Sequence, residues 1–101
     1  MTPEKRLMNE IRIECGRRGW IVIRHNVGRF LLINGQYLDT GLPKGFPDMQ
    51  VLTDDGRSIF VETKIKPRKL SPEQVAMHEL LKTKKHVVIV CYSIKDFLKN
   101  T

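Results

Sequence analysis

The feature that most constrains the fold of this chain is a strand-like run at residues 59–65, with the sequence IFVETKI. Alternate side chains of a β-strand point to opposite faces, so Ile59 and Val61 share one face and suit a hydrophobic core. Glu62 and Lys64 share the other face of a largely apolar run. Burying ionised groups costs several kcal/mol unless they are paired or bind a metal ion. The run is therefore either a surface strand with a solvated Glu/Lys face or a buried strand that carries a functional site.

Helix and strand signals surround this run. Thr2 followed by Pro3 is typical of a helix start, and Gly19 is typical of a helix end. Ser71 followed by Pro72 marks a second helix start. The predicted helices cover residues 3–18, 72–83 and 94–100, and the predicted strands cover residues 20–25, 30–33, 36–38, 48–52, 58–66 and 86–91.

The connections between the strands indicate their directions. A tight turn at residues 54–56 makes strands 48–52 and 58–66 antiparallel neighbours. A helix joins strand 58–66 to strand 86–91, as in a parallel crossover. The expected fold class is therefore α/β, a single compact domain over residues 1–101 with a central mixed sheet flanked by helices.

Composition and charge narrow the classes of function. The 101 residues include 18 Lys and Arg against 11 Asp and Glu, a net charge of +7. A basic domain favours a polyanionic partner, because neutralising phosphates releases condensed counterions. No apolar stretch approaches the ~18 residues of a transmembrane helix, and Cys15 and Cys91 lack the spacing of a disulfide framework or zinc site. We expect a soluble cytoplasmic protein with two buried free thiols and no membrane partner.

Asp48 adds a second carboxylate to the charged face of the central run. It follows Pro47 in a strand that a tight turn brings beside Glu62, so Asp48, Glu62 and Lys64 converge at one sheet margin. Two carboxylates without His or Cys partners suit Mg²⁺, which takes few protein ligands and keeps several waters. A bound Mg²⁺ polarises a phosphoryl oxygen and lowers the pKa of a coordinated water, while Lys64 orients that water or stabilises developing charge. The residues themselves indicate metal-assisted phosphodiester hydrolysis.

Spaced motifs carry a family resemblance. Gly45-x-Pro-Asp48, thirteen further residues and then Glu62-x-Lys64 resemble the PD-(D/E)xK nuclease signature. The continuation at residues 69–74, KLSPEQ, is similar to the virus-type replication-repair nuclease (VRR-NUC) branch, in which a glutamine opens the helix after the catalytic strand. The resemblance extends from the Glu4 helix through Gly19, Arg24 and Gly28 to the final strand. It implies a restriction-endonuclease-like domain.

The resemblance also implies an activity and the residues that carry it. VRR-NUC members are Mg²⁺- or Mn²⁺-dependent endonucleases, which makes Asp48 and Glu62 metal ligands and adds the backbone carbonyl of Thr63. Lys64 becomes the catalytic lysine. Gln74 becomes an active-site residue that contacts water or phosphate, although a glutamine there also suits the polar N-terminus of a helix. No organic cofactor is implied.

The family places a glutamate of the first helix near the metal, and this chain offers Glu4, Glu10 and Glu14. Helical phase favours Glu4, which lies in line with the apolar stripe that includes Met8. Glu10 and Glu14 share a face with basic residues. The alternative for Glu4 is that it only complements the helix dipole.

Basic residues near these motifs are candidate DNA contacts, with solvated surface as the ordinary alternative. They are Arg24, Lys44, Lys66, Arg68 and Lys69. No aromatic residue is interleaved with the basic run at residues 66–69, which argues against a stacking platform for single strands. His25, His78 and His86 are not spaced as a metal site, so no role is assigned to them.

Charge and resemblance together predict an endonuclease for branched DNA such as four-way junctions. The stand-alone viral members act as dimers, so we expect a homodimer in the cytoplasm of a bacterial or phage-infected cell. Asn34-Gly35 readily takes the positive φ angles of a two-residue hairpin turn, and this hairpin and the edge at residues 87–91 are the options for the dimer contact. The alternatives are a non-catalytic DNA-binding module of the same fold and a structural or interaction protein.

Overall fold

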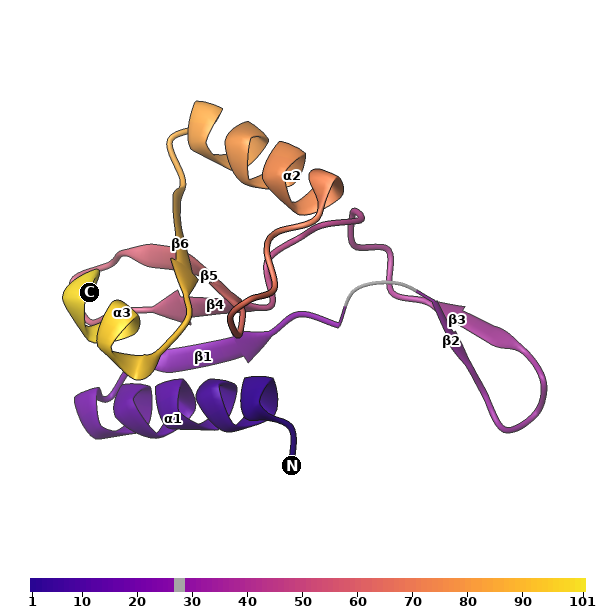
Figure 1. The fold of residues 1–101 in the computed structure, drawn as a ribbon, viewed down its shortest axis with the longest axis horizontal. Helices are drawn as coiled ribbons and strands as arrows, with labels where there is room; N and C mark the ends of the chain where they lie inside the picture. Colours follow the sequence, from indigo (N-terminus) through magenta and orange to yellow (C-terminus); the bar gives the residue numbers. More distant parts are fainter. Residues whose placement is uncertain (27–28) are drawn as a thin grey trace.

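A four-stranded mixed sheet forms the centre of the computed structural model, which describes residues 1–26 and 29–101. In spatial order its strands are β1 (Ile21–Arg24), β4 (Met49–Leu52), β5 (Ser58–Thr63) and β6 (Val87–Cys91). The helices are α1 (Pro3–Arg18), α2 (Pro72–Thr83) and α3 (Ile94–Lys99), and a separate hairpin pairs β2 (Arg29–Leu31) with β3 (Tyr37–Asp39). Figure 1 shows α1 and α2 on opposite sides of the sheet and the hairpin projecting away from it. The predicted α/β fold class is confirmed.

Helix α1 begins and ends where its sequence predicts. The Thr2 hydroxyl accepts a hydrogen bond from the backbone N–H of Lys5 (3.2 Å), and Gly19 ends the helix with a φ of 72°. Such positive φ angles cost little only for glycine. The apolar side of the helix, which includes the buried Ile11 and Cys15, packs on the sheet.

The hydrophobic core lies on the α1 side of the sheet. Ile59 and Val61 of β5 are buried there with Ile11 of α1 and Phe97 of α3. Adjacent residues of a strand point to opposite faces, so Glu62 points to the α2 side. The predicted alternation along β5 is therefore confirmed.

The strand directions are also as predicted. β4 runs antiparallel to β5, with Met49 opposite Val61, and β5 runs parallel to β6. The predicted extension of this strand to residue 66 is wrong, because β5 ends at Thr63. The N–H of Arg68 donates to the carbonyl of Ile65 (3.0 Å), so the chain leaves the sheet in a turn over residues 65–68, which contains Pro67. Proline has no N–H to offer to a strand ladder.

The hairpin closes with a longer turn than the predicted two-residue one. The N–H of Leu32 donates to the carbonyl of Gln36 (2.7 Å), which leaves three residues in the turn, and Gly35 has a φ of 84°. Asn34 is not among the described residues with positive φ, and its side-chain oxygen accepts from the N–H of Gln36 (3.0 Å). The side chain of Asn34 thus stabilises the turn in place of a left-handed backbone. The predicted end of the preceding strand at residues 26–28 and the motif residue Gly28 fall partly or wholly outside the described residues.

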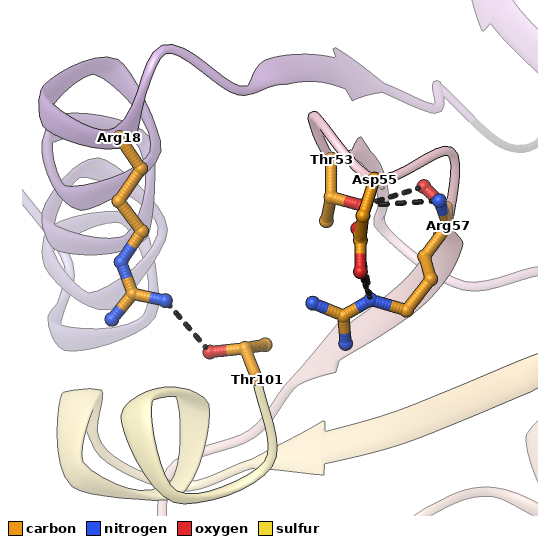
Figure 2. Close-up of polar contacts among 5 residues, drawn as sticks. All are labelled: Arg18, Thr53, Asp55, Arg57 and Thr101. Atoms are coloured by element: carbon orange, nitrogen blue, oxygen red, sulfur yellow. Dashed lines mark hydrogen bonds and ion pairs between the residues drawn. The ribbon is translucent and has the colours of Figure 1, made fainter.

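Side-chain hydrogen bonds stabilise the end of the sheet that lies away from Asp48. In the turn between β4 and β5, Arg57 donates from its Nε to Asp55 (2.9 Å) and from its backbone N–H to the Thr53 hydroxyl (3.0 Å) (Figure 2). Hydrogen bonds from Thr53 and Arg57 lower the pKa of the Asp55 carboxyl. Arg18, the last residue of α1, donates to the hydroxyl of Thr101 (3.3 Å), so the end of α1 is joined to the residues that follow α3 (Figure 2).

Both cysteines are buried free thiols, as predicted. Burial raises the pKa of Cys15 to about 11 and that of Cys91 to about 12, so both remain protonated and unreactive near neutral pH. Within the part of the chain that the structure describes, no helix is long and apolar enough to cross a bilayer.

Candidate active site

The antiparallel pairing of β4 and β5 brings Asp48 to the end of β5. Asp48 directly precedes β4, and one oxygen of its carboxyl group accepts from both the N–H (2.9 Å) and the hydroxyl (2.9 Å) of Thr63. The carbonyl of Asp48 accepts from the N–H of His25 (2.8 Å). The backbone and the side chain of Asp48 are therefore both held in place at the end of β5.

Glu62 is buried beneath this point, with 1% of its surface exposed. Its Oε1 lies 3.1 Å from Nε2 of His78, a residue of α2 that is 3% exposed. This burial excludes the surface-strand interpretation of the Glu/Lys face. The remaining interpretation, a buried strand with polar groups gathered at its end, is the one that the structure supports.

The carboxyl groups of Glu62 and Asp48 are in contact. Burial, a hydrogen bond with Asp48 and the charge of Asp48 raise the pKa of Glu62 to about 9, although Lys64 acts in the opposite direction. Burial also lowers the pKa of His78. Both shifts favour the uncharged forms, and in either charge state the contact between Glu62 and His78 is a hydrogen bond.

Glu4 is the glutamate of α1 that reaches this region. It lines a cavity of about 240 Å³ together with Asp48, Arg24 and His25, and its charge contributes to the raised pKa of Glu62. Glu14 instead pairs with Arg18 (2.9 Å), and Glu10 is exposed. Of the three glutamates left open by the sequence, the structure brings Glu4 beside Asp48.

A glycine couples the loop before Asp48 to helix α2. Gly45 has a φ of 83°, and a Cβ at this position would overlap the carbonyl group of Glu73 and lie 2.8 Å from the backbone nitrogen of Gln74. Lys44 Nζ also lies 3.5 Å from the carboxylate of Glu73. The loop therefore packs directly on the first turn of α2, and Lys44, predicted as a DNA contact, lies beside Glu73.

Gln74 stabilises the start of α2. Its side-chain oxygen accepts from the N–H of Ser71 (2.9 Å), and its own N–H donates to the Ser71 hydroxyl (3.1 Å). These reciprocal bonds form a capping box. The side-chain oxygen of Gln74 therefore stabilises the helix start, as the alternative interpretation of this residue predicted. Its amide nitrogen remains to contact water or phosphate.

Two histidines that the sequence analysis left without a role lie beside these carboxyl groups. His78 follows Gln74 by one helical turn and lies on the inward face of α2. This helical position, and not the spacing of the histidines, is the sequence signal for its contact with Glu62. The ring of His25 lies 3.0 Å from the carbonyl of Pro47 and 5.0 Å from the ring of Phe46. His25 thus helps to hold the Pro47-Asp48 segment.

The remaining predicted residues lie around the same end of the sheet. Lys64 follows β5 and is partly exposed, and its charge acts on Glu62. Arg68 lines a second cavity, of about 350 Å³, together with Glu4 and Ile65. Lys66 and Lys69 are exposed in the loop after β5.

The donor set suits a hard divalent cation with few protein ligands. Two carboxyl groups in contact, one of them buried, are compensated either by a shared proton or by a cation between them. Asp48 and Glu62 supply oxygen, which Mg²⁺ and Mn²⁺ accept. Among residues 1–26 and 29–101, no group of three or more His, Cys, Asp or Glu side chains is arranged as a metal site. A cation here would thus depend on backbone oxygen and water for its other ligands.

The whole fold matches a known nuclease-type domain. A solved structure described as a "VRR_NUC domain" has 25% sequence identity to this chain and a TM-score of 0.75, over 98% of this chain and 94% of that one. This chain has the VRR-NUC fold. No family model matches it, and no curated protein matches it significantly. The restriction-endonuclease-like architecture expected from the motifs is therefore confirmed by structure and not by sequence profiles.

The close approach of Gly45 to the backbone of α2 explains the glycine of the Gly-x-Pro-Asp motif, and a matched pair of variants tests this explanation. Gly45→Ala and Gly41→Ala both place alanine at positive φ, but only position 45 meets the backbone of α2. We expect Gly41→Ala to lower the free energy of unfolding by about 1–2 kcal/mol, and Gly45→Ala to lower it by about 1–3 kcal/mol more. Urea denaturation measures both, and equal losses would contradict the contact between the loop and α2.

The contact between His78 and Glu62 predicts a second stability effect. His78→Ala leaves the buried carboxyl group of Glu62 without its partner on α2, so we expect the free energy of unfolding to fall by about 1–3 kcal/mol. Glu79→Ala is the control, because residue 79 is the next on the helix and is exposed. Urea denaturation with unchanged m-values measures both variants. An equal loss in the two would show that the contact contributes nothing to the free energy of unfolding.

Proposed function

We propose that this protein is a metal-dependent endonuclease that hydrolyses phosphodiester bonds of DNA. The observation that carries the proposal is the position of Asp48, which is bonded to Thr63 beside the buried Glu62 at the end of β5, with Lys64 directly after it. The likeness to a VRR_NUC domain over 98% of the chain supports a nuclease-type, DNA-processing domain.

In this proposal the carboxyl groups of Asp48 and Glu62 and the backbone carbonyl of Thr63 hold Mg²⁺ or Mn²⁺. When bound, the ion polarises a phosphoryl oxygen and makes water a better nucleophile at neutral pH. Thr63 keeps the Asp48 carboxyl in place through two hydrogen bonds. His78 orients Glu62 from the side of α2.

The other residues of the proposed site act on water and phosphate. Lys64 orients the attacking water or stabilises the charge that develops on the phosphate. Glu4 faces the same cavity as Asp48, where Arg24 offers a positive charge to a phosphate of the bound strand. The amide nitrogen of Gln74 is a further donor, once its oxygen is committed to Ser71.

The proposed substrate is branched DNA, such as a four-way junction. The net charge of +7 supplies attraction to phosphate without sequence preference. A domain of this size has little surface for reading bases, so recognition of DNA shape is the remaining basis for selectivity. Two copies related by two-fold symmetry would match the symmetry of such a junction.

The hairpin of β2 and β3 supports the proposal of a homodimer. It pairs with no other strand in the described part of the chain, and its apolar side chains Leu31, Ile33 and Leu38 are exposed. An isolated two-stranded hairpin is marginally stable in water, and exposed apolar groups of this kind are typical of an interface. Of the two contacts left open by the sequence, this observation favours the hairpin.

Two substitutions test the nuclease activity. Asp48→Asn keeps an oxygen for Thr63 but removes the charge, and Lys64→Ala removes the ammonium group. We expect each to reduce the cleavage rate of a four-way junction in Mg²⁺ by about 10²–10³-fold or more, with an unchanged circular dichroism spectrum. Lys84→Ala, at an exposed position after α2, should cleave like the wild type.

A binding measurement completes this test. Mn²⁺ should raise the melting temperature of the wild type but not of Asp48→Asn, because a ligand that binds only the folded state stabilises it. Retained cleavage by either active-site variant would refute the proposed site. DNA binding without cleavage by the wild type would establish the alternative, a non-catalytic DNA-binding module.

Charged substitutions in the hairpin test the homodimer. Ile33→Asp places a carboxylate at a fully exposed apolar position of the hairpin, and we expect it to convert the dimer to a monomer in light scattering coupled to gel filtration. Ile13→Asp, at an exposed apolar position of α1, is the control and should stay dimeric. A wild-type monomer at all concentrations would contradict the dimer.

A further inference from the structure

A tyrosine lies against the basic loop that follows β5. Tyr92 directly follows β6, and the parallel register that pairs Thr63 with Cys91 brings it beside the residues after Thr63. Lys66 Nζ lies 5.8 Å from the centre of the Tyr92 ring. Tyr92 and residues 66–69 together line a cavity of about 340 Å³. The aromatic residue that the basic run lacks in sequence is thus supplied by the next strand of the sheet.

This cavity and the candidate active site are related through residues that line more than one cavity. Arg68 lines both the Tyr92 cavity and the 350 Å³ cavity that contains Glu4. Glu4 in turn lines the 240 Å³ cavity that contains Asp48. We call this series of three cavities, from Asp48 past Glu4 and Arg68 to Tyr92, the flanking groove.

The far end of the flanking groove has an apolar floor and a basic rim. Tyr92 and Pro67 provide the apolar surface, and Lys66, Arg68 and Lys69 provide the charge. Within the described residues none of these three cations forms an ion pair, and all three are exposed. Asp96, which lines a neighbouring cavity with Lys66 and Tyr92, accepts a hydrogen bond from the N–H of Tyr92 (2.8 Å).

A basic rim next to a tyrosine ring favours one kind of ligand. A basic rim attracts phosphates, and a tyrosine ring beside it stacks on a planar base. A base inside a duplex has both faces covered by its neighbours, whereas an unpaired base has a face to offer. The ligand that uses both features is therefore an unpaired nucleotide.

We propose that the flanking groove binds an unpaired nucleotide of the DNA strand that leaves the active site. Its base stacks on Tyr92 and Pro67, and the phosphates beside it contact Lys66, Arg68 and Lys69. This inference rests on the proposed DNA-processing function and adds to it a preference for DNA with a single-stranded arm next to the cleavage point.

Fluorescence anisotropy in EDTA, which prevents cleavage, tests the stacking. The probes are a duplex with a single-stranded arm and a blunt duplex of the same sequence. We expect Tyr92→Leu to weaken binding of the armed probe about 10-fold and to leave the blunt duplex unchanged, while Tyr92→Phe binds both like the wild type. Equal weakening on both probes, or none on either, would overturn the inference.

A second variant covers the case in which Tyr92→Leu does not fold. Lys66→Gln combined with Lys69→Gln should reduce the salt dependence of binding to the armed probe by about two phosphate contacts. The matched control, Lys84→Gln with Lys99→Gln, changes the charge equally at exposed positions outside the groove. An equal change in both double variants would overturn the assignment of phosphates to the groove.

Photocrosslinking tests directly whether a base of the single-stranded arm lies against Tyr92. A 5-iododeoxyuridine in the single-stranded arm should crosslink to Tyr92 of the wild-type protein, as located by mass spectrometry. Binding and cleavage of DNA without this crosslink would overturn the flanking groove and leave the nuclease proposal standing. Failure of the wild type to bind or cleave any DNA would instead refute the proposed function, and the inference with it.

Discussion

The burial of one carboxyl group, that of Glu62, is the constraint on which the rest of the structure depends. A buried carboxyl needs partners, and Glu62 has them on two sides: Asp48, directly before β4, and His78 of the helix α2. Asp48 is in turn held by Thr63, and the loop before it packs through Gly45 on α2. The elements around the site are therefore linked through one polar group at the end of β5.

The hydrophobic core and the polar groups of the candidate active site occupy different parts of the sheet. The hydrophobic core lies on the α1 side of the sheet, where Ile59 and Val61 pack with Phe97. The polar groups lie at one end of the same strands, and the turn at the opposite end is held by its own hydrogen bonds from Arg57. Two carboxyl groups repel each other when they are close and ionised, and they can stay close here because the core supplies the stability that positions them.

The fold decides where the charged and apolar groups of the surface gather. The net charge of +7 predicts a polyanionic partner but not where it binds. The fold concentrates uncompensated cations beside the site, at residues 66–69, and adds the ring of Tyr92 to them. It also leaves the hairpin of β2 and β3 outside the sheet, with the apolar side chains of Leu31, Ile33 and Leu38 exposed (Figure 1).

Local signals in the sequence determined the helix bounds, the strand directions and the convergence of Asp48 with Glu62, because caps, alternation and short turns act over a few residues. Three features depended on the tertiary structure: the contact of His78 with Glu62, the position of Tyr92 beside the basic loop and the packing of Gly45 on α2. Each joins segments distant in sequence, so no periodicity or spacing within one segment reports it. The early end of β5 and the three-residue hairpin turn are instead local, because backbone hydrogen bonds between residues three and four positions apart decide them.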